Sequence, residues 1–226
     1  MINKIMQFDS ICVSIGEQSY SNILVALEKV NFAEIRLDVS RITSSEIKSV
    51  FSSGKRLIAT CREGFYDNAA RRERLFEAIS AGAVFVDVET ESDDDFREAI
   101  AEQARLNNCK LIVSYHNFDK TPSLPEMYRI VDICKKQGAD IVKLVTTARN
   151  KSDAARTMSL YGKYHDTNLV AFAMGEAGLI TRIACVFLGA PYTYAAISDD
   201  KPLASGQLSM DKMRNVMNNL KLEVNG

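Results

Sequence analysis

The 226-residue chain lacks the features that would take a protein to a membrane or to a nucleic acid. No apolar stretch approaches the ~20 residues of a membrane span. The first residues, Met1–Gln7, contain neither the apolar core nor the small-residue cleavage site of a signal peptide. A net charge of −1 and a pI near 6.2 give no sign of nucleic-acid or membrane binding. We therefore expect a cytoplasmic protein.

The sequence is also poor in residues that build metal sites and disulfide frameworks. It has only two histidines, and its five cysteines are scattered without a C-x-x-C pair: Cys12, Cys61, Cys109, Cys134 and Cys185. Cys12 and Cys61 lie in apolar runs, where a reduced cysteine behaves as a small hydrophobic side chain. We expect buried, inert thiols and no bound metal.

Short apolar runs alternate with amphipathic segments along the whole chain. Eight runs predict strands, at Ile11–Ile15, Ala33–Leu37, Leu57–Cys61, Val84–Glu89, Leu111–His116, Ile141–Val145, Leu169–Met174 and Tyr192–Ala196. Eight segments predict helices, at Glu17–Val30, Ser44–Ser52, Asn68–Ala81, Asp93–Asn107, Pro122–Gln137, Lys151–Tyr164, Leu179–Leu188 and Leu208–Leu220. Pro122 is expected in the first turn of its helix, and Gly138 is expected to end that helix.

Eight strand–helix units predict an α/β fold with a parallel sheet closed into a (β/α)8 TIM barrel. The length is close to the ~250 residues typical of that fold. An open doubly wound sheet is the main alternative, but no G-x-G-x-x-G follows the first strand, where Gly16 stands alone. No linker-like stretch divides the chain, so we expect a single domain over residues 1–226.

One predicted strand carries a lysine among apolar residues, and the strand before it ends in a histidine. Lys143 stands in Ile141–Val145, and His116 closes Leu111–His116. Burial of an ammonium is costly and favours the neutral amine, which is the form that attacks a carbonyl. His116 is placed to serve that amine as acid and base. The alternative is a structural lysine paired with a glutamate beside a hydrogen-bonded histidine.

Other polar residues follow the predicted strands at the end where barrels of this kind carry their active sites. Arg36, Arg62 and Arg182 suggest an anionic substrate, because a guanidinium binds a carboxylate through two hydrogen bonds. Glu34 lies on the same strand face as Arg36 and could bind ring hydroxyls with it. The alternative is a structural ion pair between the two. His165 has polar neighbours and is expected at the surface.

Several ordered motifs together resemble the type I 3-dehydroquinate dehydratases, over nearly the whole chain from Ile11 to Leu220. They are Glu34-Ile35-Arg36-Leu37-Asp38, Val113-Ser114-Tyr115-His116-Asn117-Phe118, Thr121-Pro122, Gly138-Ala139-Asp140-Ile141-Val142-Lys143, Gly178-Leu179-Ile180-Thr181-Arg182 and Gly206-Gln207. The resemblance implies a (β/α)8 hydro-lyase that converts 3-dehydroquinate to 3-dehydroshikimate, the third step of the shikimate pathway of aromatic amino-acid biosynthesis. It implies no metal or cofactor, no nucleic-acid or membrane partner, and a homodimer.

Carried over by motif, the resemblance makes Lys143 the Schiff-base lysine, His116 the general acid/base and Glu63 the acid that supports the histidine. Substrate binding is implied for Glu34, Arg36, Arg62, Arg182, Gln207, Ser205, Ser14, Met174 and Tyr194. The chain departs from the family at one point, because the family's serine falls at Leu203, and Ser205 would take its place if the loop shifts. The segment Ser198–Gln207 is read as a lid over the barrel mouth.

Two other functions fit the same barrel. A Schiff-base aldolase would share Lys143, but it normally needs a phosphate site after strands seven and eight. Gly175-Glu176-Ala177-Gly178 puts a carboxylate there instead. A non-catalytic barrel that binds a small acid or a protein would have no need of the Lys143–His116 pair.

Overall fold

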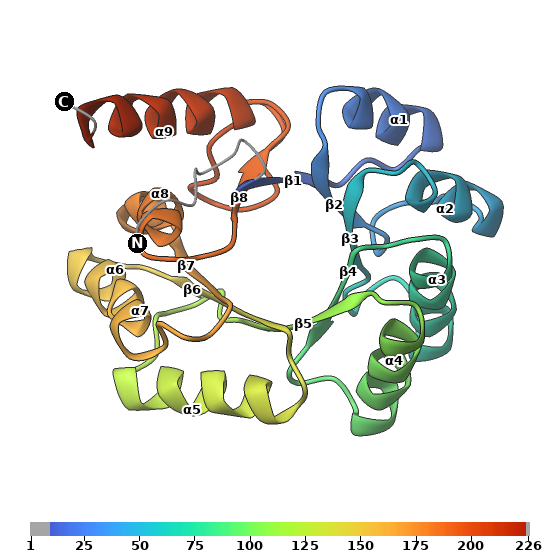
Figure 1. Cartoon of the computed structure of the whole chain (residues 1–226), viewed down its shortest axis with the longest axis horizontal. Helices are drawn as coiled ribbons and strands as arrows, with labels where there is room; N and C mark the ends of the chain where they lie inside the picture. The colour runs from blue at the N-terminus through green and yellow to red at the C-terminus, as the bar shows by residue number, and fades with distance from the viewer. Residues whose placement is uncertain (1–9, 225–226) are drawn as a thin grey trace.

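The computed structural model describes residues 10–224, and within them eight parallel strands form a nearly closed barrel ringed by helices (Figure 1). The strands are β1 (Ile11–Ile15), β2 (Phe32–Arg36), β3 (Arg56–Thr60), β4 (Phe85–Glu89), β5 (Lys110–His116), β6 (Ile141–Thr147), β7 (Leu169–Met174) and β8 (Thr193–Ala196). The predicted (β/α)8 fold is confirmed.

Helices follow the strands and cover the outside of the barrel. They are α1 (Tyr20–Glu28), α2 (Ser44–Phe51), α3 (Asn68–Ser80), α4 (Asp94–Leu106), α5 (Leu124–Lys136), α6 (Lys151–Met158), α7 (Leu160–Lys163), α8 (Leu179–Phe187) and α9 (Met210–Val224), with a 3-10 turn at Glu176–Gly178. The helix expected over residues 151–164 is two helices, because the chain breaks at Ser159, whose Oγ donates to the Arg156 carbonyl at 2.7 Å.

The start of α5 also differs from the prediction. Ser123 is the N-cap and forms a capping box with Glu126, whose carboxylate accepts from the Ser123 backbone N–H at 2.8 Å. The proline of the first turn is therefore Pro125, and Pro122 precedes the helix. Gly138 does end α5, with a φ of 84° that favours glycine.

Strand order rules out the open doubly wound sheet. Each strand from β1 to β7 pairs in parallel with its neighbours in sequence, and β8 returns to pair with β1, where Val13 lies opposite Ala195. A doubly wound sheet would instead reverse its strand order in the middle. Between β7 and β8, no strand pairing occurs within residues 10–224.

Side chains alternate between the barrel interior and the helices, as the period of two in a strand requires. In β6, Ile141 and Val145 belong to the interior cluster, whereas Val142 and Leu144 pack under the helices. Lys143 has the same parity as Ile141 and Val145 and therefore faces inward. Interior positions are apolar at the start of the strands and become polar toward their carboxyl ends, as in Phe32, Glu34 and Arg36 of β2. This gradient places the polar side chains at one mouth of the barrel.

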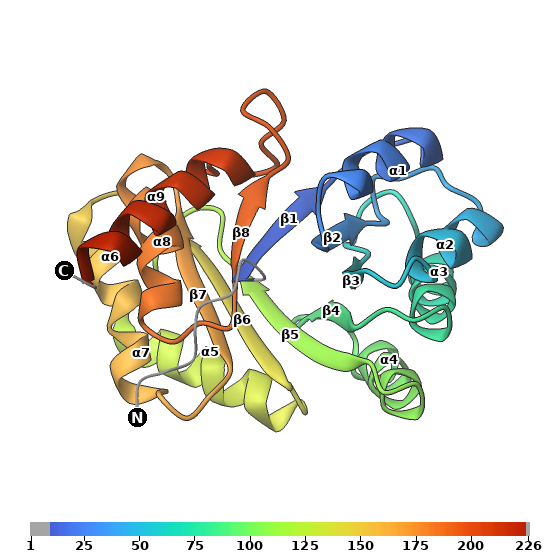
Figure 2. The same ribbon diagram turned by 45° about the horizontal axis from the view of Figure 1, so that its top comes forward.

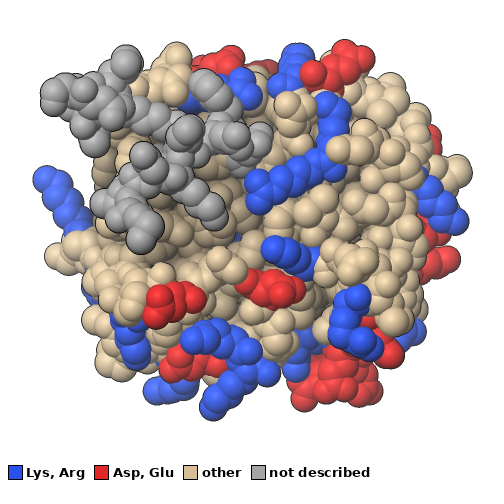
Figure 3. Space-filling model, viewed as in Figure 1, with Lys and Arg blue, Asp and Glu red and all other residues tan. Residues whose placement is uncertain are grey.

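The loop between β8 and α9 extends beyond the tip of β8 (Figure 2). The five cysteines are buried and unpaired, as expected. No helix within the described part of the chain is both long and apolar enough to cross a membrane. On the face seen in Figure 3, Lys and Arg side chains are intermixed with Asp and Glu, as the small net charge would suggest.

Candidate active site

A cavity of about 260 Å³ opens at the carboxyl ends of the strands. Ten of the twelve predicted site residues line it: Ser14, Glu34, Arg36, Arg62, His116, Lys143, Met174, Arg182, Tyr194 and Gln207. They come from β1, β2, β5, β6, β7, β8 and the segments that follow the strands. The two predicted residues that do not line the cavity are Glu63 and Ser205.

Lys143 is buried at the floor of the cavity between two carboxylates. Its Nζ donates to Asp87 Oδ2 at 2.9 Å and to Glu34 Oε1 at 3.2 Å, and it lies 4.3 Å from the centroid of the Tyr194 ring. Thr60 Oγ1 donates to the same Glu34 oxygen at 3.0 Å. The charge of the lysine is therefore balanced by carboxylates, and the arginines of the mouth lie beyond them.

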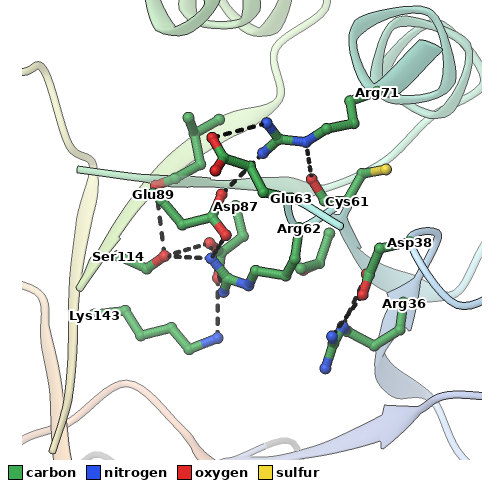
Figure 4. Close-up of polar contacts among 12 residues, drawn as sticks. Arg36, Asp38, Cys61, Arg62, Glu63, Arg71, Asp87, Glu89, Ser114 and Lys143 are labelled. Atoms are coloured by element: carbon green, nitrogen blue, oxygen red, sulfur yellow. Dashed lines mark hydrogen bonds and ion pairs between the residues drawn. The ribbon is translucent and has the colours of Figure 1, made fainter. Parts of the chain in front are cut away.

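Asp87 connects Lys143 to Arg62 (Figure 4). Its Oδ1 lies 3.0 Å from Arg62 Nη2 in an ion pair and accepts from Ser114 Oγ at 2.6 Å, while Oδ2 faces Lys143. Burial alone would raise the pKa of Asp87, but Arg62 and Lys143 outweigh burial and hold that pKa below its ordinary value. Asp87 is therefore a fixed anion between two cations.

Arg62 is held by a second carboxylate as well. Its Nη1 lies 3.2 Å from Glu89 Oε1 and donates to Ser114 Oγ at 2.9 Å. The other Glu89 oxygen accepts from the buried Arg71 at 3.1 Å. This network leaves Arg62 with a defined orientation at the edge of the cavity.

His116 lies on the strand next to Lys143. Ser114 is in register with Lys143, and His116 is in register with Val145, so the histidine is one inward position nearer the mouth than the lysine. Burial together with the nearby cations Arg62 and Lys143 lowers the pKa of His116 well below its ordinary value. The imidazole is therefore neutral near pH 7 and able to accept a proton.

Arg182 is the one buried cation of the cavity that no carboxylate contacts among the described residues. Its guanidinium lies 4.4 Å from the Phe172 ring centroid and donates to the Ser205 carbonyl at 3.4 Å, while its buried Nε has no hydrogen-bond partner. Burial lowers the pKa of Arg182 to about 10. An unpaired, desolvated guanidinium in a cavity is suited to an anionic ligand.

The loop after β8 closes one side of the cavity. Gln207 Nε2 donates to Ser14 Oγ at 3.4 Å, and Leu203 N donates to Gln207 Oε1 at 2.8 Å. Leu203 and Ala204 line the cavity, whereas Ser205 is exposed and contributes only its carbonyl oxygen. Gly206 fixes this arrangement, because its φ of 71° and its contact with the Gly175 carbonyl leave no room for a Cβ. The proposed replacement of the family serine by Ser205 is therefore not what the structure shows.

Glu63 also lies away from the position expected for it. Its carboxylate is 70% exposed and faces Arg71 at 3.4 Å, on the far side of Glu89 from Lys143 (Figure 4). The carboxylates that line the cavity are Glu34, Glu89 and Glu91. Among the described residues, His116 has no carboxylate partner within hydrogen-bond distance.

Sequence reasoning missed several residues of this site. Asp87 is the most important, although it stands in an apolar strand as Lys143 does, and the same signal could have identified it. The remaining cavity residues not predicted are Glu89, Glu91, Phe118, Val145, Phe172, Leu203 and Ala204. No three His, Cys, Asp or Glu side chains in the described ranges are grouped so that they could hold a metal ion.

Comparison with known proteins agrees with this geometry. A family model described as type I 3-dehydroquinase matches residues 11–223. The 3-dehydroquinate dehydratase of Dehalococcoides mccartyi is 35% identical over 214 residues, which cover 92% of this chain and 94% of the relative. That of Desulfotalea psychrophila is 32% identical over 222 residues, covering 93% and 98%.

A solved structure supports the fold independently. The type I 3-dehydroquinate dehydratase of Clostridium difficile, solved with covalently modified comenic acid, superposes with a TM-score of 0.83. The two chains are 23% identical, and the match covers 94% of this chain and 92% of the other. Because the family model spans nearly the whole chain and the relatives exceed 30% identity, this protein belongs to the type I 3-dehydroquinase family of hydro-lyases.

Proposed function

We propose that this chain dehydrates 3-dehydroquinate to 3-dehydroshikimate through a Schiff base on Lys143, with His116 as the general acid/base. One observation carries the proposal: a buried amine, a neutral imidazole and a guanidinium that no carboxylate contacts among the described residues line the same cavity. The substrate is a ring with a ketone, hydroxyls and a carboxylate. The amine can attack the ketone, the imidazole can move protons during loss of a hydroxyl, and the guanidinium can bind the carboxylate. This reaction is the third step of the shikimate pathway.

The reaction begins at Lys143. Its ammonium gives a proton to the neutral imidazole of His116, and the free amine attacks the ketone carbon to form a carbinolamine. His116 returns the proton to the carbinolamine hydroxyl, which leaves as water, and a protonated imine remains. Asp87 and Glu34 hold Nζ by two hydrogen bonds, so the amine is directed before the substrate arrives. The iminium draws electrons from the neighbouring carbon more strongly than the ketone would.

His116 then removes a proton from the carbon next to the imine, because its imidazole is neutral and available. The C–H electrons form an enamine, which expels the hydroxyl two carbons from the imine carbon. That hydroxyl takes the proton from His116 and leaves as water. Hydrolysis of the product imine restores Lys143, and acid–base catalysis of this kind contributes about 10²–10⁴-fold in rate.

The remaining cavity residues orient the substrate. Arg182 is assigned to the carboxylate, because it is buried, charged and without a carboxylate partner among the described residues. Glu34, Arg36 and Arg62 are assigned to the ring hydroxyls, while Met174 and Tyr194 pack against the ring. Gln207 and Ser14, which already contact each other, are assigned to the lid side of the substrate.

A dehydration assay tests this function directly. Purified protein is mixed with 3-dehydroquinate, and the conjugated product is followed by its ultraviolet absorbance. The expected result is turnover by the wild type and almost none by Lys143→Ala. A wild type that binds 3-dehydroquinate without converting it would instead support a non-catalytic barrel, and cleavage of a carbon–carbon bond would support an aldolase.

A further inference from the structure

We propose that the segment Asn117–Thr121, fastened to the end of β6 by Thr147 and Thr121, is a positioning unit that fixes His116 relative to Lys143. This inference rests on the proposed role of His116 and extends it to two threonines outside the cavity. Neither Thr121 nor Thr147 lines the cavity.

The imidazole of His116 is not held by a hydrogen bond from any described side chain. Neither ring nitrogen has a hydrogen-bond partner within residues 10–220, so no side chain holds the imidazole directly. The one ring that stacks on it among the described residues is that of Phe118, whose centroid lies 6.0 Å away with an interplanar angle of 16°. The position of the ring therefore depends on the backbone of His116 and on the loop that carries Phe118.

The second observation is that this loop remains bonded to β6 after β5 has ended. Asn117 N donates to the Val145 carbonyl at 2.9 Å, and Thr147 Oγ1 donates to the Asn117 carbonyl at 3.0 Å. Thr121 Oγ1 donates to the Thr147 carbonyl at 3.0 Å, and Thr147 N lies 3.4 Å from the Lys120 carbonyl. Since β6 also carries Lys143, these bonds connect the supports of the two reacting groups.

The loop is closed upon itself by Asn117. Its Oδ1 accepts from the backbone N–H groups of Asp119 and Lys120, at 3.1 and 2.9 Å, which is an Asx turn. Its Nδ2 donates to Tyr115 Oη at 3.1 Å. A single side chain thus shapes the turn that begins directly after His116.

Behind the loop, buried hydroxyls connect it to α6. Thr121 Oγ1 lies 3.0 Å from Thr146 Oγ1, which lies 3.4 Å from Thr157 Oγ1. Thr121, Thr146 and Thr157 are all buried. Arg156 adds hydrogen bonds at 3.1 Å to the carbonyls of Thr121 and Pro122. Buried polar groups that are fully paired hold a loop in one conformation.

The test replaces Thr147 by valine, which keeps the branched shape and removes the hydroxyl that donates to Asn117. A misplacement of about 1 Å can cost on the order of 100-fold in rate. We expect Thr147→Val to lower kcat by about 10-fold to 100-fold with little change in KM, and Thr147→Ser to restore the wild-type rate. The matched control is Thr90→Val, which loses a comparable hydrogen bond from Thr90 Oγ1 to Gln137 Oε1 at 2.7 Å.

A second readout does not depend on turnover. The chain has two histidines, so an NMR titration resolves His116 beside the exposed His165 as an internal reference. The groups that act on His116 are Arg62 after β3, Lys143 of β6, Asp87 of β4 and Arg36 of β2. In Thr147→Val the ring should move away from these cations and into solvent. The pKa of His116 should then rise toward its ordinary value.

The outcomes separate this inference from the proposed function. An unchanged kcat and an unchanged His116 titration in folded Thr147→Val would overturn the positioning unit, as would an equal loss in Thr147→Ser. If Thr147→Val does not fold, Asn117→Ala is measured instead, at a half-buried position, with the same expectation and the same contrary result. Failure of the wild type to dehydrate 3-dehydroquinate would overturn the proposed function alone, because the titration would still report the position of the ring.

Discussion

Lys143 Nζ and Asp87 Oδ2 lie 2.9 Å apart in the barrel interior, and the second Asp87 oxygen lies 3.0 Å from Arg62. The carboxylate therefore serves the reacting amine and an arginine of the cavity wall at once. Its side chain has no exposed surface, so neither interaction is screened by solvent. This three-residue unit is the electrostatic centre of the site.

The first prediction follows from that unit. Asp87→Asn keeps the shape of the side chain but removes the carboxylate charge that Lys143 and Arg62 share. An unpaired charge in the buried barrel interior destabilises the fold. Removing one partner of a buried pair typically costs about 3–5 kcal/mol in the free energy of unfolding. Denaturant unfolding should show a loss of that size, and turnover should fall because Nζ is no longer directed.

The matched control is Asp199→Asn, which removes the partner of Lys212 in an ion pair whose two side chains are both 60% exposed. A surface ion pair contributes little, so this variant should unfold like the wild type. Equal stability of Asp87→Asn and the wild type would show that Asp87 is not the counter-charge of the site.

The second prediction concerns pH. His116 acts as a base only when neutral, and its pKa is held below the ordinary value by burial, Arg62 and Lys143. Activity should therefore persist below the ordinary histidine pKa of about 6.5. It should fall only when the pH drops through the lowered value and the imidazole gains its proton. The acid limb of kcat/KM measures this value, and a limb at or above pH 6.5 would contradict the account.

The third prediction separates substrate binding from stability at Arg182. This guanidinium is buried without a carboxylate among the described residues, which is unfavourable for folding but suited to an anionic substrate. Arg182→Met, of similar volume, should leave the free energy of unfolding unchanged or raise it. The same variant should lose about 10-fold to 100-fold in kcat/KM through the missing charged hydrogen bonds.

Arg182→Lys serves as the comparison, because it keeps the charge but not the bidentate geometry. Its kcat/KM should lie between those of the wild type and Arg182→Met. Thermal unfolding and steady-state kinetics measure both quantities. A methionine variant that unfolds more easily yet keeps the wild-type KM would mean that Arg182 is a structural residue.

The fourth prediction concerns the loop after β8. All residues from 198 to 207 are exposed or half-buried. Their polar contacts to the rest of the barrel include the ion pairs Lys201–Glu17 and Asp199–Lys212, the hydrogen bond from Gln207 to Ser14, and bonds to the Ser205 carbonyl from Arg182 and Gly175. Backbone amides of residues 198–207 should exchange hydrogen faster without ligand than with 3-dehydroquinate bound. Gln207→Ala should raise KM while borohydride trapping of the imine survives. Equal exchange in both states would show that the loop is a fixed wall.

The fold followed from the sequence because the strands of a barrel are buried on both faces and read as apolar runs. β1 and β7 have the bounds predicted for them, Ile11–Ile15 and Leu169–Met174. Lys143 and His116 could be located because each stands at the inward parity of such a run. Asp87 carries the same signal within Phe85–Glu89 and could have been found by the same reasoning.

Residues on loops were harder to place, because the sequence does not fix the direction of a side chain outside a strand. Glu63 follows Arg62 directly, yet its exposed carboxylate turns to the buried Arg71 while Arg62 turns into the cavity. Ser205 faces outward because the conformation at Gly206 sets the course of the chain there. The direction of such a side chain depends on contacts with residues that are distant in the sequence.

The central claim is that Lys143 forms a covalent imine with the substrate. It is tested most directly by adding borohydride to the protein with saturating 3-dehydroquinate and mapping the modified peptide by mass spectrometry. Lys143→Ala and the wild type without substrate are the controls. The account predicts one reduced adduct, on Lys143 and on no other lysine, which is absent from both controls. An active wild type whose Lys143 stays unmodified under these conditions would contradict it.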